Sequence, residues 1–219
     1  MRFSLLVNKC LHYVMIACKK YEIDESHGIG HAMKVVQFAQ QILQSELFEK
    51  PNLIDQKNII ITSSLLHDTF DRKYVDTDIG LTAMDTFLQT ECSDLLTDEE
   101  IEMSKTIMKT MSYSTVKKVG YPSLGEYQSA YHIVREADLL SAYDIDRCTI
   151  FTLAKNRMNE NDASFESVFK ETVDLLFSRM ALYTESDLFI HEWSKKEAKR
   201  LYLDSLEQLV VWKNILYLT

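Results

Sequence analysis

Four polar side chains interrupt apolar stretches of the sequence and could together bind a cation. His31 opens an apolar stripe that continues to Ile42, His67 and Asp68 follow a strongly apolar segment, and Asp138 shares a predicted helix face with apolar residues. Hydrogen bonds in a core could satisfy any one of them. An unpaired buried carboxylate, however, is costly or takes up a proton. A divalent cation would neutralise both carboxylates, and mixed N and O ligation suits Mn, Fe, Co, Ni or Zn better than Ca or Mg.

Long helices are the elements that must position these four residues. The 219 residues include only 5 Gly and 2 Pro. A chain so poor in turn-forming residues cannot supply the many hairpins of a sandwich or a barrel. The hydrophobic content of 46% and the charged content of 26% are those of an ordinary folded domain. We therefore predict an all-α protein.

Apolar periodicity and capping signals predict helices over most of the chain. The predicted segments are 3–21, 26 to a break at Pro51, 54–70, 79–90, 97–111, 126–158, 164–183 and 187–215. Residues 112–125 contain Gly120, Pro122 and Gly125 and are predicted to form a loop. No repeat, linker or low-complexity segment divides the sequence, so we predict a single domain over residues 1–219.

Charge and cysteine content restrict the partners and the compartment. The net charge is −9 and no long basic run is present, which argues against binding of extended nucleic acid. The 4 cysteines form no CxxC pair and are typical of reduced thiols. No apolar run approaches the roughly 18 residues of a membrane span, and residues 3–21 fit an amphipathic helix better than a signal peptide. We expect a cytoplasmic protein with no membrane partner, and homo-oligomerisation stays open.

Three segments of the chain resemble the H…HD…D signature of the HD superfamily of metal-dependent phosphohydrolases. SHGIGHAMKV (26–35) resembles the opening motif, and LLHDTFDRKY (65–74) resembles the LLHDxxDxK segment of the small nucleotide-pyrophosphohydrolase branch. READLLSAYD (135–144) resembles the closing motif. These blocks lie within residues 26–148. The resemblance implies an HD-domain-like bundle of six or more helices around a metal site.

The resemblance also implies a ligand set. The metal ligands would be His31, His67, Asp68 and Asp138, holding one divalent transition-metal ion. Mn²⁺ is the first expectation, with Co²⁺, Ni²⁺, Fe²⁺, Zn²⁺ or Mg²⁺ as alternatives. Members with two metals insert further histidines after the HD pair, and here none occurs between His67 and His132. One metal per site is therefore expected.

Two further residues are candidates for proton transfer. Asp71 stands where hydrolases of this superfamily place an acid that orients or deprotonates water, and it shares a helical face with His67 if that helix continues. His27 precedes His31 by one helical turn and could face the substrate or move a proton. For His27, an ordinary histidine at a helix N-terminus is an equal alternative.

Four lysines are candidates for binding substrate phosphate. Lys34 stands where the family pattern usually has arginine, so it keeps the charge but lacks the bidentate fork. Lys73 follows the HD segment, and Lys117 and Lys118 lie in the predicted loop. Solvation is the ordinary state of a surface lysine, and it remains the alternative for the loop pair.

The resemblance implies attack of a metal-bound water on phosphorus. The expected substrate is a small phosphorylated metabolite, above all a nucleotide, and the activity that of a nucleoside triphosphate pyrophosphohydrolase or a nucleotidase. The alternative is a non-catalytic, metal-stabilised HD-type domain that senses a nucleotide or binds a partner protein. All four ligands would be retained in such a domain. Asp71 favours the enzyme, because a structural metal site has no use for it.

Overall fold

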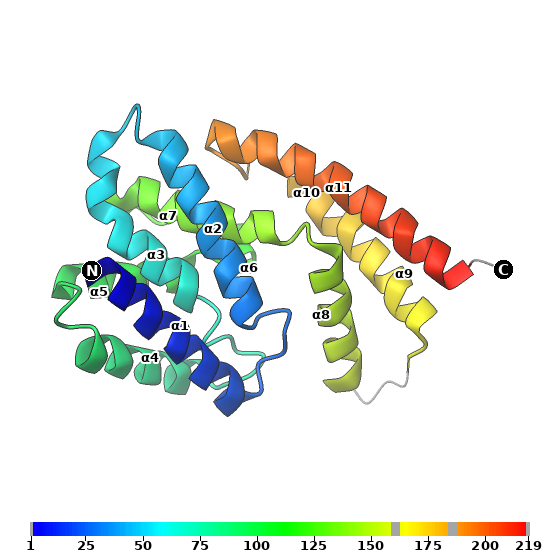
Figure 1. Ribbon diagram of the computed structural model, residues 1–219, viewed down its shortest axis with the longest axis horizontal. Coiled ribbons are helices and arrows are strands. Elements are labelled where there is room, and N and C mark those ends of the chain that lie inside the picture. The colour runs from blue at the N-terminus through cyan, green and yellow to red at the C-terminus, as the bar shows by residue number, and fades with distance from the viewer. Residues whose placement is uncertain (1, 159–162, 184–187, 218–219) are drawn as a thin grey trace.

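The computed structural model describes residues 2–158, 163–183 and 188–217, which form helices and turns without any strand (Figure 1). The elements are α1 (Arg2–Tyr21), α2 (Ile29–Glu46), the 3₁₀ helix η1 (Pro51–Gln56), α3 (Lys57–Leu66), α4 (Thr77–Glu91), α5 (Asp98–Thr110), α6 (Tyr113–Val119), the 3₁₀ turn η2 (Gly125–Tyr127), α7 (Gln128–Ser141), α8 (Ile145–Met158), α9 (Phe165–Leu175), the π-helical turn η3 (Leu176–Met180), α10 (Ala181–Tyr183) and α11 (Glu192–Tyr217). The predicted all-α class is confirmed.

Helix α3 packs against α1, α2, α5 and α7. Every residue from Ile59 to Leu66 is buried, because the segment is apolar on nearly all sides. One face of α3 joins α2, α7 and α11 in the larger hydrophobic cluster, and another joins α1, α4 and α5 in the smaller cluster. The residues directly after Leu66 are therefore held between two packed cores, which fixes the position of His67.

The second half of the chain extends the bundle away from α1 (Figure 1). Helix α8 packs against α9, and α11 packs against α7, α8 and α2. Along α9, buried residues recur at helical spacing, and the helix continues through η3 into α10. None of the helices in the described ranges combines the length and the apolarity that a bilayer crossing requires.

The predicted helix over residues 54–70 is too long at both ends. Residues Pro51–Gln56 form a 3₁₀ helix, and the α-helix ends at Leu66, so the next residues form a turn in which the Asp71 N–H donates to the Asp68 carbonyl (3.3 Å). The prediction counted apolar periodicity alone. In this turn the Thr69 N–H and hydroxyl both donate to the Leu66 carbonyl (3.1 and 2.8 Å), a local arrangement that apolar periodicity does not predict.

The predicted loop over residues 112–125 contains a short helix. The Ser112 side chain accepts a hydrogen bond from the Thr115 N–H and so caps α6, and Gly120 ends the helix at a φ of 79°. The left-handed φ requires a glycine at this position. The prediction gave weight to Gly120, Pro122 and Gly125 and overlooked the capping serine that precedes them.

The predicted continuous helix over residues 126–158 is two helices. Helix α7 ends at Ser141, and α8 begins after Asp144, whose side chain accepts a hydrogen bond from the Arg147 N–H (3.0 Å). For the last predicted segment, residue 187 lies outside the described residues, and α11 runs from Glu192 to Tyr217.

Candidate metal centre

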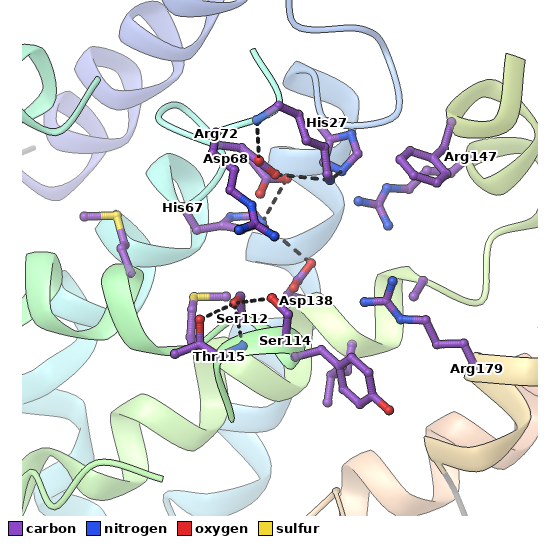
Figure 2. Close-up of a pocket in the computed structure, with 18 of the residues that line it drawn as sticks. His27, His67, Asp68, Arg72, Ser112, Ser114, Thr115, Asp138, Arg147 and Arg179 are labelled. Carbon is purple, nitrogen blue, oxygen red and sulfur yellow. Dashed lines mark hydrogen bonds and ion pairs between the residues drawn. The ribbon is translucent and has the colours of Figure 1, made fainter. Parts of the chain in front are cut away.

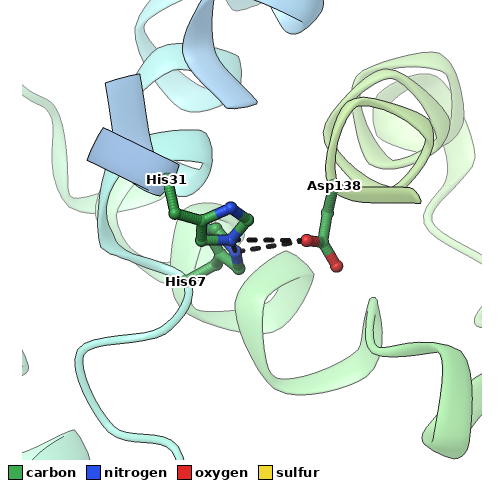
Figure 3. A group of neighbouring side chains, drawn as sticks. All are labelled: His31, His67 and Asp138. Atoms are coloured by element: carbon green, nitrogen blue, oxygen red, sulfur yellow. Dashed lines mark hydrogen bonds and ion pairs between the residues drawn. The ribbon is translucent and has the colours of Figure 1, made fainter. Parts of the chain in front are cut away.

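Three of the four predicted ligands form a tight group of side chains (Figure 3). His31 lies in the first turn of α2, His67 caps the C-terminus of α3 and Asp138 lies on α7. Their ligand atoms lie within 4.8 Å of one another, with 3.0 Å between the two Nε2 atoms. Asp138 Oδ1 is 3.5 Å from His31 Nε2 and 3.6 Å from His67 Nε2. Residues more than one hundred positions apart in the chain thus converge on one point.

Asp68, the fourth predicted ligand, approaches the same two nitrogens. Its Oδ2 lies 3.0 Å from His31 Nε2 and 3.3 Å from His67 Nε2. This oxygen is buried and, among the described residues, accepts no hydrogen bond of proper geometry. An acceptor buried without a donor is a costly arrangement that a cation would relieve.

The outer ring nitrogens of both histidines contact protein acceptors. His67 Nδ1 lies 3.0 Å from the Ser64 carbonyl, and His31 Nδ1 lies 3.4 Å from Ser141 Oγ, whose proton goes to the Asp138 carbonyl. An Nδ1–H that donates outward leaves the Nε2 lone pair directed at the centre of the group. Partners of this kind set the tautomer and the ring orientation of metal-ligating histidines.

Burial and mutual contacts shift the pKa values of these side chains in different directions. Burial, together with the charge of Arg147, lowers the pKa of His31 to about 4. Burial also acts against protonation of His67, but Asp68 and Asp138 outweigh it and raise the His67 pKa well above its usual value. The same contacts lower the pKa of Asp138 to about 2 despite its burial. Two carboxylates therefore share one imidazolium, and one negative charge remains for a cation to neutralise.

This donor set fits a single transition-metal ion. Two imidazole nitrogens and two carboxylate oxygens are the mixed ligands of Mn, Fe, Co, Ni or Zn sites. The Nε2 atoms face the carboxylates, and the outer nitrogens are occupied. The protein residues alone leave part of the negative charge of this group without a counterion.

A cavity of about 520 Å³ opens beside the group (Figure 2). His67, Asp68 and Asp138 line one part of it, and hydroxyl side chains of the α6 region line the facing part. Its cationic lining residues are Arg72, Lys73, Lys109, Arg147 and Arg179. A cavity with these cations in a chain of net charge −9 is suited to a small anion.

His27 lies at this cavity in a chain of hydrogen bonds. Its Nε2 is 3.0 Å from Lys73 Nζ, which can only donate, and its Nδ1 is 2.8 Å from Ser26 Oγ and 3.0 Å from the Tyr74 hydroxyl. Both of these hydroxyls donate to Asp24, so Nδ1 is the donor toward them. Burial, with further contributions from Lys73, lowers the pKa of His27. The imidazole is thus neutral, with its Nε2 lone pair facing the ammonium group.

Asp71 lines the cavity, although it does not share a helical face with His67 as the sequence analysis expected. Because α3 ends at Leu66, no helical face connects Asp71 with His67. The turn after Asp68 places it instead, and its carboxylate accepts from the Lys73 N–H (2.9 Å) and pairs with Lys73 Nζ (3.1 Å). Asp71 and His27 therefore contact the same ammonium group.

The other predicted phosphate-binding lysines lie away from this cavity. Lys34 is exposed on α2, with its Nζ 5.0 Å from the centre of the Phe38 ring, and it does not line the cavity. Lys117 and Lys118 are exposed on α6 and line a smaller adjoining hollow.

Of the five cationic residues that line the cavity, only Lys73 was predicted, and the contacts of Arg147 and Arg179 were not anticipated. Arg147 donates from Nε to the Ser26 carbonyl (2.5 Å) and brings Nη2 to 3.4 Å from His31 Nε2. Arg179 lies in the π-helical turn η3. Arg147 lies three residues after the READLLSAYD block, which ends at Asp144, the residue that caps α8. This closeness in sequence was the one feature that could have pointed to Arg147. The sequence held no comparable signal for Arg179, whose place depends on how α9 packs.

Comparisons with known proteins show the fold and no more. No protein-family profile matches the chain, and no curated protein matches it. Among solved structures, the chain is similar to the crystal structure of a Lactobacillus plantarum protein determined as a structural genomics target. The TM-score is 0.65 at 14% identity, with 98% of each chain covered. The two chains thus share the whole fold, and the similarity carries no statement about activity.

Proposed function

We propose that the chain is a metal-dependent phosphohydrolase of the HD type that acts on a small phosphorylated metabolite, above all a nucleotide. One observation carries this proposal: two imidazoles and two carboxylates converge with a net negative charge at the wall of a cavity lined with cations. The convergence fits a divalent ion, and the cations fit a phosphate group beside it. Mn²⁺ is the first choice of ion.

The ligands are proposed as His31, His67, Asp68 and Asp138. A divalent ion bound there lowers the pKa of water and polarises a phosphoryl oxygen. The Ser64 carbonyl faces the Nδ1–H of His67, so His67 would bind the ion through Nε2 once that nitrogen has lost its proton.

The residues around the ligands bind the phosphate and move the proton. Lys73 and Arg147 donate to the phosphoryl oxygens and stabilise the charge that develops on them. Binding of phosphate draws the Lys73 ammonium away from His27, which then accepts a proton at Nε2. Asp71 orients Lys73 and is the second candidate for the proton.

A hydrolysis screen tests the proposal. Nucleoside mono-, di- and triphosphates are incubated with the protein and Mn²⁺, Co²⁺, Ni²⁺ or Mg²⁺, and phosphate and pyrophosphate are measured separately. Pyrophosphate from triphosphates indicates a pyrophosphohydrolase, and phosphate from monophosphates indicates a nucleotidase. Asp68→Ala serves as the blank. Cleavage that persists in Asp68→Ala, or none with any ion, would contradict the proposal, and the second result would favour a non-catalytic sensor.

Matched variants separate the two candidates for the proton. His27→Gln keeps a polar side chain that cannot accept a proton at neutral pH, and Asp71→Asn does the same for the carboxylate. We expect His27→Gln to lower kcat about a hundredfold, as loss of a general base does. Asp71→Asn, which only orients Lys73, should lower kcat less and raise KM. The reverse order would assign the proton to Asp71.

A further inference from the structure

A second, smaller hollow adjoins the main cavity. Its lining side chains are positively charged, whereas the chain as a whole is negative. It has a volume of about 420 Å³ and is lined by Tyr113, Ser114, Lys117, Lys118 and Arg179. Three of these five side chains are cationic and none is acidic, whereas the whole chain carries a net charge of −9. A concentrated positive field in an acidic protein attracts an anion.

Aromatic side chains hold two of these cations in place. The ring centre of Tyr113 lies 4.8 Å from Arg179 Cζ and 6.0 Å from Lys117 Nζ, distances at which a cation is attracted to an aromatic face. Arg179 Nε also donates to the hydroxyl of the buried Tyr183 (2.6 Å). The Nη1 and Nη2 groups have no hydrogen-bond partner among the described residues, so an oriented guanidinium keeps its donors for a ligand.

Arg179 connects this hollow with the metal centre. Arg179, Tyr113 and Ser114 line both hollows. In Figure 2 the side chain of Arg179 extends toward Asp138, from the side of the cavity that also carries Arg147. It leaves the backbone at a π-helical turn, a rare element that is frequent at functional sites. The two hollows therefore adjoin at Arg179, and Lys117 and Lys118 lie on the side away from the metal centre.

We propose that Arg179, Lys117 and Lys118 form a distal anion site for a second phosphate group of the ligand whose first phosphate lies at the metal centre. This inference rests on the proposed function. The arginine fork binds a phosphate through two donors, and the two lysines add positive charge beyond it. The distal anion site accordingly selects ligands with two or more linked phosphates over monophosphates.

Binding of inorganic tripolyphosphate tests the distal anion site without any turnover. Titration calorimetry is carried out with EDTA present, so that no metal-dependent cleavage occurs, on the parent protein, Arg179→Gln and the double variant Lys117→Gln/Lys118→Gln. The matched control is Lys19→Gln/Lys20→Gln, which removes two adjacent exposed lysines at the end of α1. Like Lys117, Lys20 lies over a tyrosine ring.

We expect about tenfold weaker tripolyphosphate binding in each of the two distal variants, since each loses charge-assisted contacts. The Lys19→Gln/Lys20→Gln control should bind tripolyphosphate within about twofold of the parent, because it leaves the distal anion site intact. Unchanged binding in both distal variants, or an equal loss in the control, overturns the proposal. Because Lys117 and Lys118 are exposed, their variant decides the result if Arg179→Gln is destabilised.

The distal anion site and the proposed hydrolase can fail separately. If no phosphate ester is cleaved but tripolyphosphate binding depends on Arg179, the hydrolase is wrong and the distal anion site stands. If the parent and Arg179→Gln cleave triphosphates and monophosphates in the same ratio, the distal anion site is wrong and the hydrolase stands.

Discussion

Helix α7 carries two acidic residues, two positions apart, that belong to buried polar clusters of opposite character. Glu136 is fully buried and its carboxylate is surrounded by donors: the N–H groups of Ile190 (2.7 Å) and His191 (3.3 Å), His191 Nδ1 (3.0 Å) and Arg135 Nη2 (3.3 Å). Every donor is supplied by the protein. This cluster ties the segment before α11 to α7.

Asp138 belongs to a cluster that is short of donors. Its Oδ1 and Asp68 Oδ2 face two imidazole nitrogens, of which the raised pKa of His67 favours only the His67 nitrogen as a charged donor. At Glu136 the protein supplies both partners, so loss of one would leave an uncompensated buried charge. At Asp138 the protein supplies fewer donors, which is the arrangement that the proposed cation would complete.

The largest expected difference between the two clusters is in activity. Asp138→Asn keeps the size of the side chain but removes the anionic ligand, so hydrolysis should fall about a thousandfold or more. Glu136→Gln lies on the same helix outside the cavity and should keep kcat within about threefold at a temperature where it is folded. Steady-state kinetics on a substrate found in the screen measures both. Equal losses would show that the clusters do not differ in function.

For stability in the absence of metal, we expect the Glu136 substitution to have the larger effect and the Asp138 substitution the smaller one. Glu136→Gln places an amide among donors and should lower the free energy of unfolding by about 3 kcal/mol, as expected for breaking a buried ion pair. Asp138→Asn removes a charge from a group with excess negative charge and should cost about 1 kcal/mol or less. Urea denaturation with EDTA present gives both values. A larger cost for Asp138→Asn would mean that its cluster is already complete without an ion.

Metal addition should stabilise the chain through one cluster only. At a Mn²⁺ concentration one hundred times the Kd, the parent and Glu136→Gln should each gain about 2.7 kcal/mol of stability. Asp138→Asn should gain much less, since one of its ligands is lost. Thermal unfolding with and without Mn²⁺ measures the gain. An equal gain in all three proteins would place the ion elsewhere.

The smallest predicted effect is the release of a proton when the metal ion binds. In the metal-free chain the pKa of His67 is raised well above 6.5, so its Nε2 is protonated at pH 7 and must lose that proton to bind an ion. Binding should therefore release about one proton at pH 7, and affinity should rise with pH until His67 is deprotonated. Calorimetry in buffers of different ionisation enthalpy counts the protons. A count of zero would contradict the protonation of His67.

The sequence predicted the convergence of residues better than the local geometry around them. His31, His67 and Asp138 could be selected because each interrupts an apolar stretch, and apolar periodicity is a strong signal in long helices. Asp71 was placed by an assumed helix that ends at Leu66, yet the turn after Asp68 brings it to the cavity. The shared helical face with His67 is absent, and the turn accounts for the position of Asp71 at the cavity.

The cationic lining could be predicted only in part. Lys73 follows His67 and Asp68 within the same segment and lines the cavity with them. Arg147 and Arg179 come from α8 and η3, and their positions depend on how those elements pack against α7. Packing of this kind brings together residues that no local pattern connects. Lys34 is the converse case, because its spacing matched the motif while its side chain lies over Phe38.

Mn²⁺ binding, followed by electron paramagnetic resonance, tests the central claim most directly. We expect one bound ion per chain in the parent and in Glu136→Gln, and loss of that ion in His67→Gln and Asp138→Asn. A parent that binds no ion, or an ion that stays bound when His67 and Asp138 are both replaced, would contradict it.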